Sequence, residues 1–455
     1  MRTNLRDARL EVLPDKVLPL LYLGTAHASL AFAFACVAYW PRAVAGFFYH
    51  SWMVALVHLV TLGWITLSIL GGLYIVAPVA LRTPLPARRS DYVAYGLLTI
   101  GLVGLVAHFW IGEFIGMAWC AVMAALGIAY VLGRVSTALW HSRAPAEVKL
   151  HIWLAAANFL GAATAGTMLA FDKAYHFLPG FVLTNVFAHA HLAAIGWAAM
   201  MAVGVAYRLL PMVLPARPPS GRSVAASAFL LELGVIVLFA GLVTQSGWAV
   251  GGGVLIAAGF ACFFVQVGVM ASHPRPRPVG AATPDYAVRH AISAGIWLIA
   301  ATAMGLVLLI VPTSERSLRL ATAYGVAGLI GFLSQLILGM EIRLLPMYAW
   351  YRRFAETDFK GTVPAPPTMG SQSIRRAVFY AWTAGVPLLA AGFFLDAAMV
   401  VGAAAWALFF GVVLAAFNGI LVTTGRIIPI RQSQSTPIQP APAPHALQTT
   451  LTARK

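Results

Sequence analysis

Charged residues and cysteines are scarce in this sequence. Asp, Glu, Lys and Arg together make up 10% of the 455 residues, and hydrophobic residues make up 60%. Soluble domains carry about 25% charged residues, so this balance excludes a soluble globular protein. The three cysteines, Cys36, Cys120 and Cys262, lie in apolar runs without CxxC spacing, which excludes a disulfide framework and a cysteine-rich zinc site.

Long apolar runs fill most of the sequence instead. A membrane helix needs about 20 apolar residues to cross the hydrocarbon core, and runs of this length recur between charged or Pro/Gly-rich breaks. They predict an all-α polytopic membrane protein with twelve transmembrane helices. The predicted spans are residues 17–40, 46–80, 92–112, 114–134, 150–171, 180–213, 223–244, 248–272, 287–311, 318–348, 376–396 and 398–426.

The basic residues indicate how these spans are oriented. The sequence has 30 Lys and Arg against 14 Asp and Glu, a formal net charge of +16. With a cytoplasmic N-terminus, 26 of the basic residues fall inside, and the four outside are Arg42, Lys173, Arg316 and Arg319. This asymmetry follows the positive-inside rule. It predicts a multi-pass protein of a bacterial-type inner membrane with both termini in the cytoplasm, and it explains the excess charge without a nucleic-acid partner.

One membrane domain, residues 17–428, is predicted between two cytoplasmic ends. Residues 1–16 form a short N-terminal segment, and residues 429–455, rich in Gln, Pro, Ala and Thr, are predicted to be a disordered tail because they cannot bury a core. Within the domain we expect three repeats of four helices, at about residues 17–134, 150–272 and 287–426.

The evidence for these repeats is self-similarity between spans 2, 6 and 10. HLVTLGWITLSILGGLYIVAP from His58 matches HLAAIGWAAMMAVGVAYRLLP from His191 at seven positions, all at an offset of 133. Span 10 continues the series at an offset of 135, with the pentapeptide RLLPM repeated at residues 343–347 and Val326 in place of the histidine. Spans 2, 6 and 10 are therefore predicted to be equivalent.

Histidines inside these spans are the strongest candidates for metal ligands, since a polar side chain in hydrocarbon is costly unless it serves a function. His58 and His191 lie about twelve residues from the outer ends of their spans, or roughly 18 Å, and His27 is expected at the same level. His189 and His191 are two residues apart and project from nearly opposite helix faces, so one helix can serve two centres. Hydrogen-bonded core histidines are the alternative interpretation.

Other features of the spans allow more than one interpretation. Five glycines are expected to permit close approach of a helix or a porphyrin: Gly63, Gly71, Gly72, Gly196 and Gly204. Three polar residues are candidates for a proton path or an ion site, or else for hydrogen-bonded packing: Glu232, Gln335 and Glu341.

Together these features resemble the catalytic subunits of the haem-copper oxidase and nitric oxide reductase superfamily, whose members have twelve spans in three arcs of four. The run HAHLAAIGWAAMMAVG at residues 189–204 is similar to the HxH segment of nitric oxide reductases, and it is also similar to NnrS-type haem- and copper-containing membrane proteins linked to nitric oxide stress. The HLVTLGW run at residues 58–64 resembles the second histidine segment of the NnrS type.

The resemblance implies that His58 and His191 are the axial ligands of a six-coordinate haem b, and that His189 ligates a second haem or metal. His27 with His189 is the nearest substitute for the family's copper centre. The sequence departs from the family in placing the HxH pair on span 6 rather than span 10, and in having no adjacent HH pair within its spans.

Three functions are consistent with these features. The first is a haem-binding membrane protein in electron transfer, or in binding or reduction of a small gas such as nitric oxide. It would contain one or two haems b, with copper as a further candidate, and its redox donor would be quinol or cytochrome c. The second is a non-enzymatic haem or copper sensor or protective binder, favoured by the missing copper ligands. The third is a secondary transporter, which threefold four-span repeats disfavour. Whether the protein is an enzyme stays open.

Overall fold

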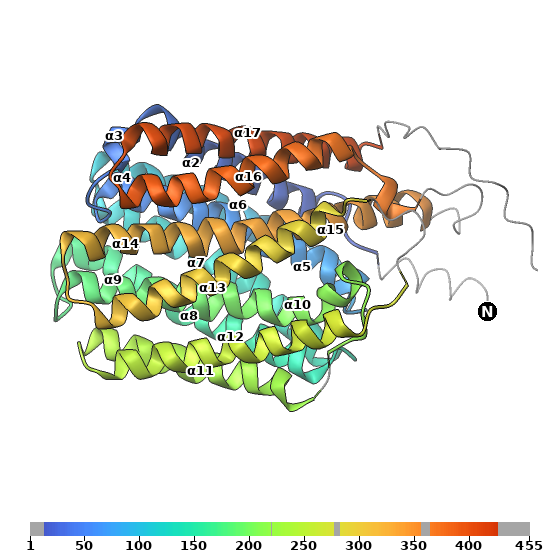
Figure 1. The fold of residues 1–455 in the computed structure, drawn as a ribbon, viewed down its shortest axis with the longest axis horizontal. Helices are drawn as coiled ribbons and strands as arrows, with labels where there is room; N and C mark the ends of the chain where they lie inside the picture. Colours follow the sequence, from blue (N-terminus) through green and yellow to red (C-terminus); the bar gives the residue numbers. More distant parts are fainter. Residues whose placement is uncertain (1–12, 220, 277–282, 356–364, 426–455) are drawn as a thin grey trace, which may run out of the picture.

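The structure, a computed structural model, is an all-helical bundle (Figure 1). It describes residues 13–219, 221–276, 283–355 and 365–425, so the predicted tail at 429–455 and most of the segment 1–16 lie outside the described residues. In the described part, 12 helices are long and apolar enough to cross a membrane, which confirms the predicted fold class.

Nine of these spans are continuous helices. They are α2 (Leu18–Tyr39), α6 (Arg89–Ile111), α7 (Phe114–Trp140), α8 (Ala146–Tyr175), α11 (Arg222–Val243), α12 (Trp248–Ser272), α13 (Tyr286–Ile310), α16 (Gln372–Phe394) and α17 (Ala398–Thr423). Their starts follow from capping, because a side-chain oxygen can accept hydrogen bonds from the first free N–H groups of a helix. Glu113 does so at the start of α7 and Asp285 at the start of α13.

Spans 2, 6 and 10 each contain a π-helical segment in the middle. The second span consists of α4 (Ser51–His58), η1 (Leu59–Thr66) and α5 (Leu67–Val79), and the sixth of α9 (Val182–His191), η2 (Leu192–Ala199) and α10 (Met200–Val213). The tenth consists of α14 (Glu315–Gly325), η3 (Val326–Ser334) and α15 (Gln335–Phe354). The three π-helical segments contact one another pairwise, so the matching sequences of these spans meet at the centre of the bundle.

These π-helical segments begin directly after His58 and His191 in the first two cases, and after Gly325 in the third. Gly325, rather than Val326, therefore occupies the position of the histidines. The alignment at offset 135 places Val326 there because η3 has nine residues and the other two segments have eight. The extra residue shifts the register within the segment.

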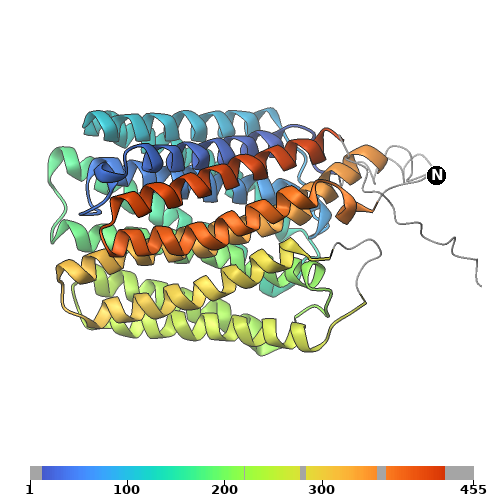
Figure 2. The same ribbon diagram turned by 45° about the horizontal axis from the view of Figure 1, so that its top comes forward.

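The remaining helices surround this central trio. Helix α2 packs on η1 and α5, α8 on η2 and α10, and α13 on η3 and α15. The pairs α6–α7, α11–α12 and α16–α17 form hairpins, and contacts α7–α8, α12–α13 and α17–α2 close the ring. Figure 2 shows α6–α7 and α11–α12 at opposite edges of the bundle.

Close packing at glycines joins the central spans to their neighbours. A Cβ atom at Gly71 would lie 2.8 Å from the Tyr22 Cβ atom on α2, and one at Gly204 would lie 2.3 Å from the His151 Cβ atom on α8. Gly63 and Gly196 are equally close to side chains of α2 and α8. The expectation of close helix approach is correct for these four. At Gly72 a Cβ would meet nothing within 4 Å, so no helix approaches closely there, and the porphyrin alternative stays a prediction.

The two ends of the bundle differ in charge. We call the end where α2 begins and α17 ends the basic end, because the loops there carry Arg82, Arg88, Arg143 and Arg217. The other end, where α4 and α9 begin, is called the opposite end. The histidines of spans 2 and 6 lie nearer the opposite end.

Candidate functional site

His58 is the last residue of α4, directly before η1. Its Nδ1 atom is 2.8 Å from the Val54 carbonyl oxygen one turn earlier. The ring stacks on Phe109 of α6, with 5.4 Å between ring centroids. The side chain is therefore held on both sides, by its own helix and by a neighbouring one.

His189 and His191 lie at the end of α9 and point to different neighbours. The Nδ1 atom of His189 is 2.9 Å from the Ala162 carbonyl oxygen on α8, whereas Nδ1 of His191 is 2.8 Å from the carbonyl oxygen of Phe187 on its own helix. Nε2 of His191 is 3.2 Å from the Tyr324 hydroxyl on α14, and these two rings stack at 5.8 Å. The two histidines thus face separate sides of α9, as their spacing predicts.

The side chains of His58, His189 and His191 are suited to ligate a haem or a metal ion that takes imidazole ligands. A backbone carbonyl can only accept a hydrogen bond, so Nδ1 carries the proton in each ring and Nε2 keeps its lone pair. Metal-ligating histidines have this arrangement, in which the second nitrogen donates to a carbonyl or a carboxylate. Each ring is also partly exposed, so accessible space adjoins it.

The carbonyl bond by itself does not identify a ligand. The same bond to the residue four positions earlier occurs at His108, His151 and His273, two of which lie near the basic end. The three candidates differ from those in lying together near the opposite end of the central spans. No group of three or more His, Cys, Asp or Glu in the described part of the chain could hold a metal ion.

The structure leaves His58 with two candidate partners, His189 and His191. The polar neighbour of His191 is Tyr324. His58 also contacts α6, and His189 contacts α8, so both border the region where α6 and α8 flank spans 2 and 6. The resemblance implies that His58 pairs with His191. Experiment decides between this pair and the pair His58 with His189.

His27 lies deeper than the other three, and the expectation of a common level is wrong. The second span begins at Ser51 rather than near residue 46, since Gly46 has a left-handed backbone (φ 104°) in the preceding loop. His58 is then seven residues, about 10 Å, from its helix start, whereas His27 is twelve residues, about 18 Å, from the end of α2. Its role as a ligand stays a prediction.

The neighbours of His27 are Trp64 and Glu341. The His27 and Trp64 rings meet edge to face, with 5.0 Å between centroids. The His27 Nε2 atom is 3.2 Å from the Glu341 Oε2 atom, and both side chains are almost fully buried. This buried acid–base pair joins the first span to the tenth.

The remaining polar candidates differ in how they are satisfied. Glu232 accepts a hydrogen bond of 2.6 Å from the Asn158 side chain, which fits the packing interpretation. Both polar side-chain atoms of Gln335 are buried and have no described hydrogen-bond partner. One carboxylate oxygen of Glu341 is likewise buried and has no described hydrogen-bond partner. A proton path through these residues stays a prediction.

Two contributors to the site are missing from the sequence-based prediction. Tyr324 lies 133 residues after His191, whereas spans 6 and 10 align at an offset of 135. The repeat therefore gives no signal for Tyr324, and it gives none for Gly166. A Cβ there would lie 2.7 Å from the His189 Cε1 atom, so only glycine leaves room for the ring in this position.

Comparison with known proteins supports the fold. No known family model matches the sequence, and no curated protein matches it. Among solved structures, the chain is similar to a cryo-EM structure of a heme-copper terminal oxidase dimer, with a TM-score of 0.56 and 11% sequence identity over 96% of this chain and 88% of that one. The protein is thus a multi-pass membrane protein with a haem-copper-oxidase-like fold.

Proposed function

We propose that this protein binds haem b in the membrane through His58 and one histidine of the HAH pair. The observation that carries the proposal is the orientation of three imidazoles near one end of the central spans, each with its Nδ1 proton on a backbone carbonyl oxygen. Bound haem would supply one-electron chemistry, and the protein supplies ligands and a dry environment. The function would be electron transfer, or binding or reduction of a small gas such as nitric oxide.

The residues have distinct roles in this proposal. His58 and His189 would hold the haem, and the Ala162 carbonyl and Phe109 ring keep the two imidazoles in place. A haem held by two imidazoles would supply electron transfer. His191, beside the Tyr324 hydroxyl, is left for a second centre, either another haem or copper.

The test is the optical spectrum of the detergent-purified protein from haem-replete cells. We expect a sharp reduced α-band that is lost in His58→Ala and His189→Ala and retained in His191→Ala. Retention in His189→Ala with loss in His191→Ala would select the pairing that the resemblance implies. His273→Ala is the matched control, because His273 has the same carbonyl bond but is exposed near the basic end. A colourless wild-type protein would reject the proposal and favour the transporter.

The second candidate function is a haem or copper sensor, or a protective binder without turnover. It is favoured because the spans have no adjacent HH pair, which the copper centre of the catalytic family requires. Consumption of nitric oxide and oxygen should be followed with an artificial reductant and with quinol or cytochrome c. Ligand-induced spectral shifts without consumption would select this function, and steady consumption would select the reductase.

The membrane orientation is part of the same proposal. The distribution of 26 basic residues on one side supports a bacterial-type inner membrane with cytoplasmic termini. Reporter fusions after residues 113 and 144, in the loops on either side of α7, test it. Alkaline phosphatase activity at the first site alone is expected, and activity at the second alone would reverse the orientation.

A further inference from the structure

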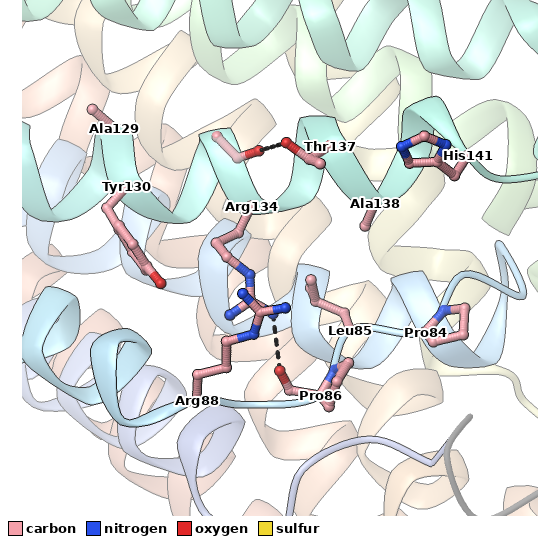
Figure 3. A pocket seen from close by; sticks show the side chains of 11 residues that line it. Pro84, Leu85, Pro86, Arg88, Ala129, Tyr130, Arg134, Thr137, Ala138 and His141 are labelled. Carbon is pink, nitrogen blue, oxygen red and sulfur yellow. Dashed lines mark hydrogen bonds between the residues drawn. The ribbon is translucent and has the colours of Figure 1, made fainter.

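A cavity of about 610 Å³ lies at the basic end, between the loop that follows α5 and the last turns of α7. Figure 3 shows its lining. Pro84, Leu85 and Pro86 form one wall, and Tyr130, Arg134 and His141 project from α7. The cavity is far from the histidines of spans 2 and 6, so it is not part of the proposed haem site.

Two guanidinium groups face each other inside this cavity. Arg88, just before α6, and Arg134, on α7, point toward one another (Figure 3). Arg134 is neutralised, because its Nη1 atom pairs with the Asp91 carboxylate at 2.8 Å and its Nη2 atom donates to the Pro86 carbonyl at 3.0 Å. Arg88 is exposed and forms no ion pair with any residue that the structure describes. Its backbone N–H donates to the Asp91 carboxylate, and its guanidinium has no acidic partner among the described residues.

The fold does not require an ion pair at this position in every repeat. In the first repeat, the Tyr74 hydroxyl donates to Asp91, at 2.9 Å. The matching residue of the second repeat, Tyr207, instead hydrogen-bonds the neutral Ser227, at 2.8 Å. The second repeat thus satisfies the equivalent tyrosine without an ion pair, whereas the third repeat has an arginine–aspartate pair of its own, Arg343 with Asp285.

The surroundings of the cavity are those of a lipid-facing interface. Leu126 is 58% exposed and Trp140 70% exposed on the same helix, and aromatic residues at such positions anchor a helix at the membrane surface. Tyr130, which lines the cavity, is also exposed. An anion that carries hydrocarbon fits both the guanidinium of Arg88 in the cavity and the apolar side chains on the adjoining surface of α7.

We propose that this cavity binds the phosphate headgroup of an anionic phospholipid, with Arg88 as its main contact. Basic pockets between helices on the cytoplasmic side of membrane proteins commonly hold such headgroups. Guanidinium groups bind phosphate by charge-assisted hydrogen bonds. His141 adds a further donor at the mouth of the cavity, and Asp91 stays occupied by Arg134 and Tyr74.

The experiment compares Arg88→Gln with the matched control Arg222→Gln in the full-length protein. Both arginines are exposed at the basic end, but Arg88 lines the cavity and Arg222, at the start of α11, does not. Delipidated protein is titrated with phosphatidylglycerol, phosphatidylcholine or inorganic phosphate. Bound lipid is counted by native mass spectrometry, and thermal stability is measured in parallel. Arg134 is not substituted, because its loss would leave the buried Asp91 carboxylate without its cationic partner.

We expect phosphatidylglycerol, and not phosphatidylcholine, to bind and stabilise the wild type. Arg88→Gln should weaken binding about tenfold, the effect of losing one strong charge-assisted contact, and Arg222→Gln should leave binding unchanged. Equal binding of both lipids, or equal effects of the two substitutions, would overturn the proposal. If inorganic phosphate alone stabilises the wild type, and Arg88→Gln abolishes this effect, the proposal of a lipid is wrong and the pocket binds a soluble anion. None of these results depends on bound haem.

Discussion

Two adjacent glycines of α5 offer a sharp test of how the central spans are packed. Gly71 and Gly72 lie on one helix at consecutive positions, so an alanine changes the intrinsic helix propensity equally at both. The surroundings differ. A Cβ at Gly71 would lie 2.8 Å from the Tyr22 Cβ atom and 3.2 Å from the Pro19 carbonyl oxygen, whereas one at Gly72 meets nothing within 4 Å.

The magnitude follows from ordinary contact distances. Carbon atoms in contact are separated by about 3.5–4.0 Å, so Gly71→Ala forces α2 and α5 apart by roughly 0.7–1.2 Å. Overpacking of this kind costs about 1–3 kcal/mol. Replacing glycine by alanine in a helix interior gains about 1 kcal/mol, and this gain cancels in the comparison. The two variants should therefore differ by about 1–3 kcal/mol in the free energy of unfolding.

The assay is the apparent Tm of each detergent-purified variant, measured at one scan rate because thermal unfolding of membrane proteins is often irreversible. Gly71→Ala should have a lower Tm than Gly72→Ala, and Gly72→Ala should equal or exceed the wild type. Gly72 lies fourteen residues after His58, roughly 21 Å along the span, so haem content does not complicate the comparison. Equal shifts in both variants, or a lower Tm for Gly72→Ala, would refute the packing.

Three further substitutions test other parts of the structure. Gly166→Ala should displace the His189 ring, because the new Cβ would lie 2.7 Å from its Cε1 atom; we expect reduced haem retention at unchanged circular dichroism. Arg134→Ala removes the cation that pairs with Asp91, whose side chain is fully buried, and should lower stability by about 3–5 kcal/mol, measured as a large fall in Tm. Glu341→Ala leaves a buried histidine nitrogen unpaired and should cost about 1–3 kcal/mol; Glu341→Gln, which retains a polar oxygen, should recover most of the lost Tm.

The sequence predicted the twelve spans because the requirement for them is local. Each segment must bury its own backbone hydrogen bonds and present about 20 apolar residues to hydrocarbon, and both properties can be read from consecutive residues. The repeat could be recognised in the sequence for a similar reason. Residues such as Gly71 and Gly204 recur because each contacts a neighbouring helix closely in its own repeat. Gly72 lacks a glycine counterpart, since Val205 stands in the matching place.

Only the tertiary structure decided which side chains meet. His191 lies beside Tyr324 from a span 133 residues away, and His27 from the first span lies beside Glu341 from the tenth. Such pairs depend on how whole helices are rotated and shifted against one another. The π-helical segments affect both the rotation and the shift of these helices, because a π turn changes the direction of every side chain that follows. The hydrophobicity of the sequence does not reveal where a π turn occurs. The sequence thus determined which helices form, and their packing determined where each histidine points.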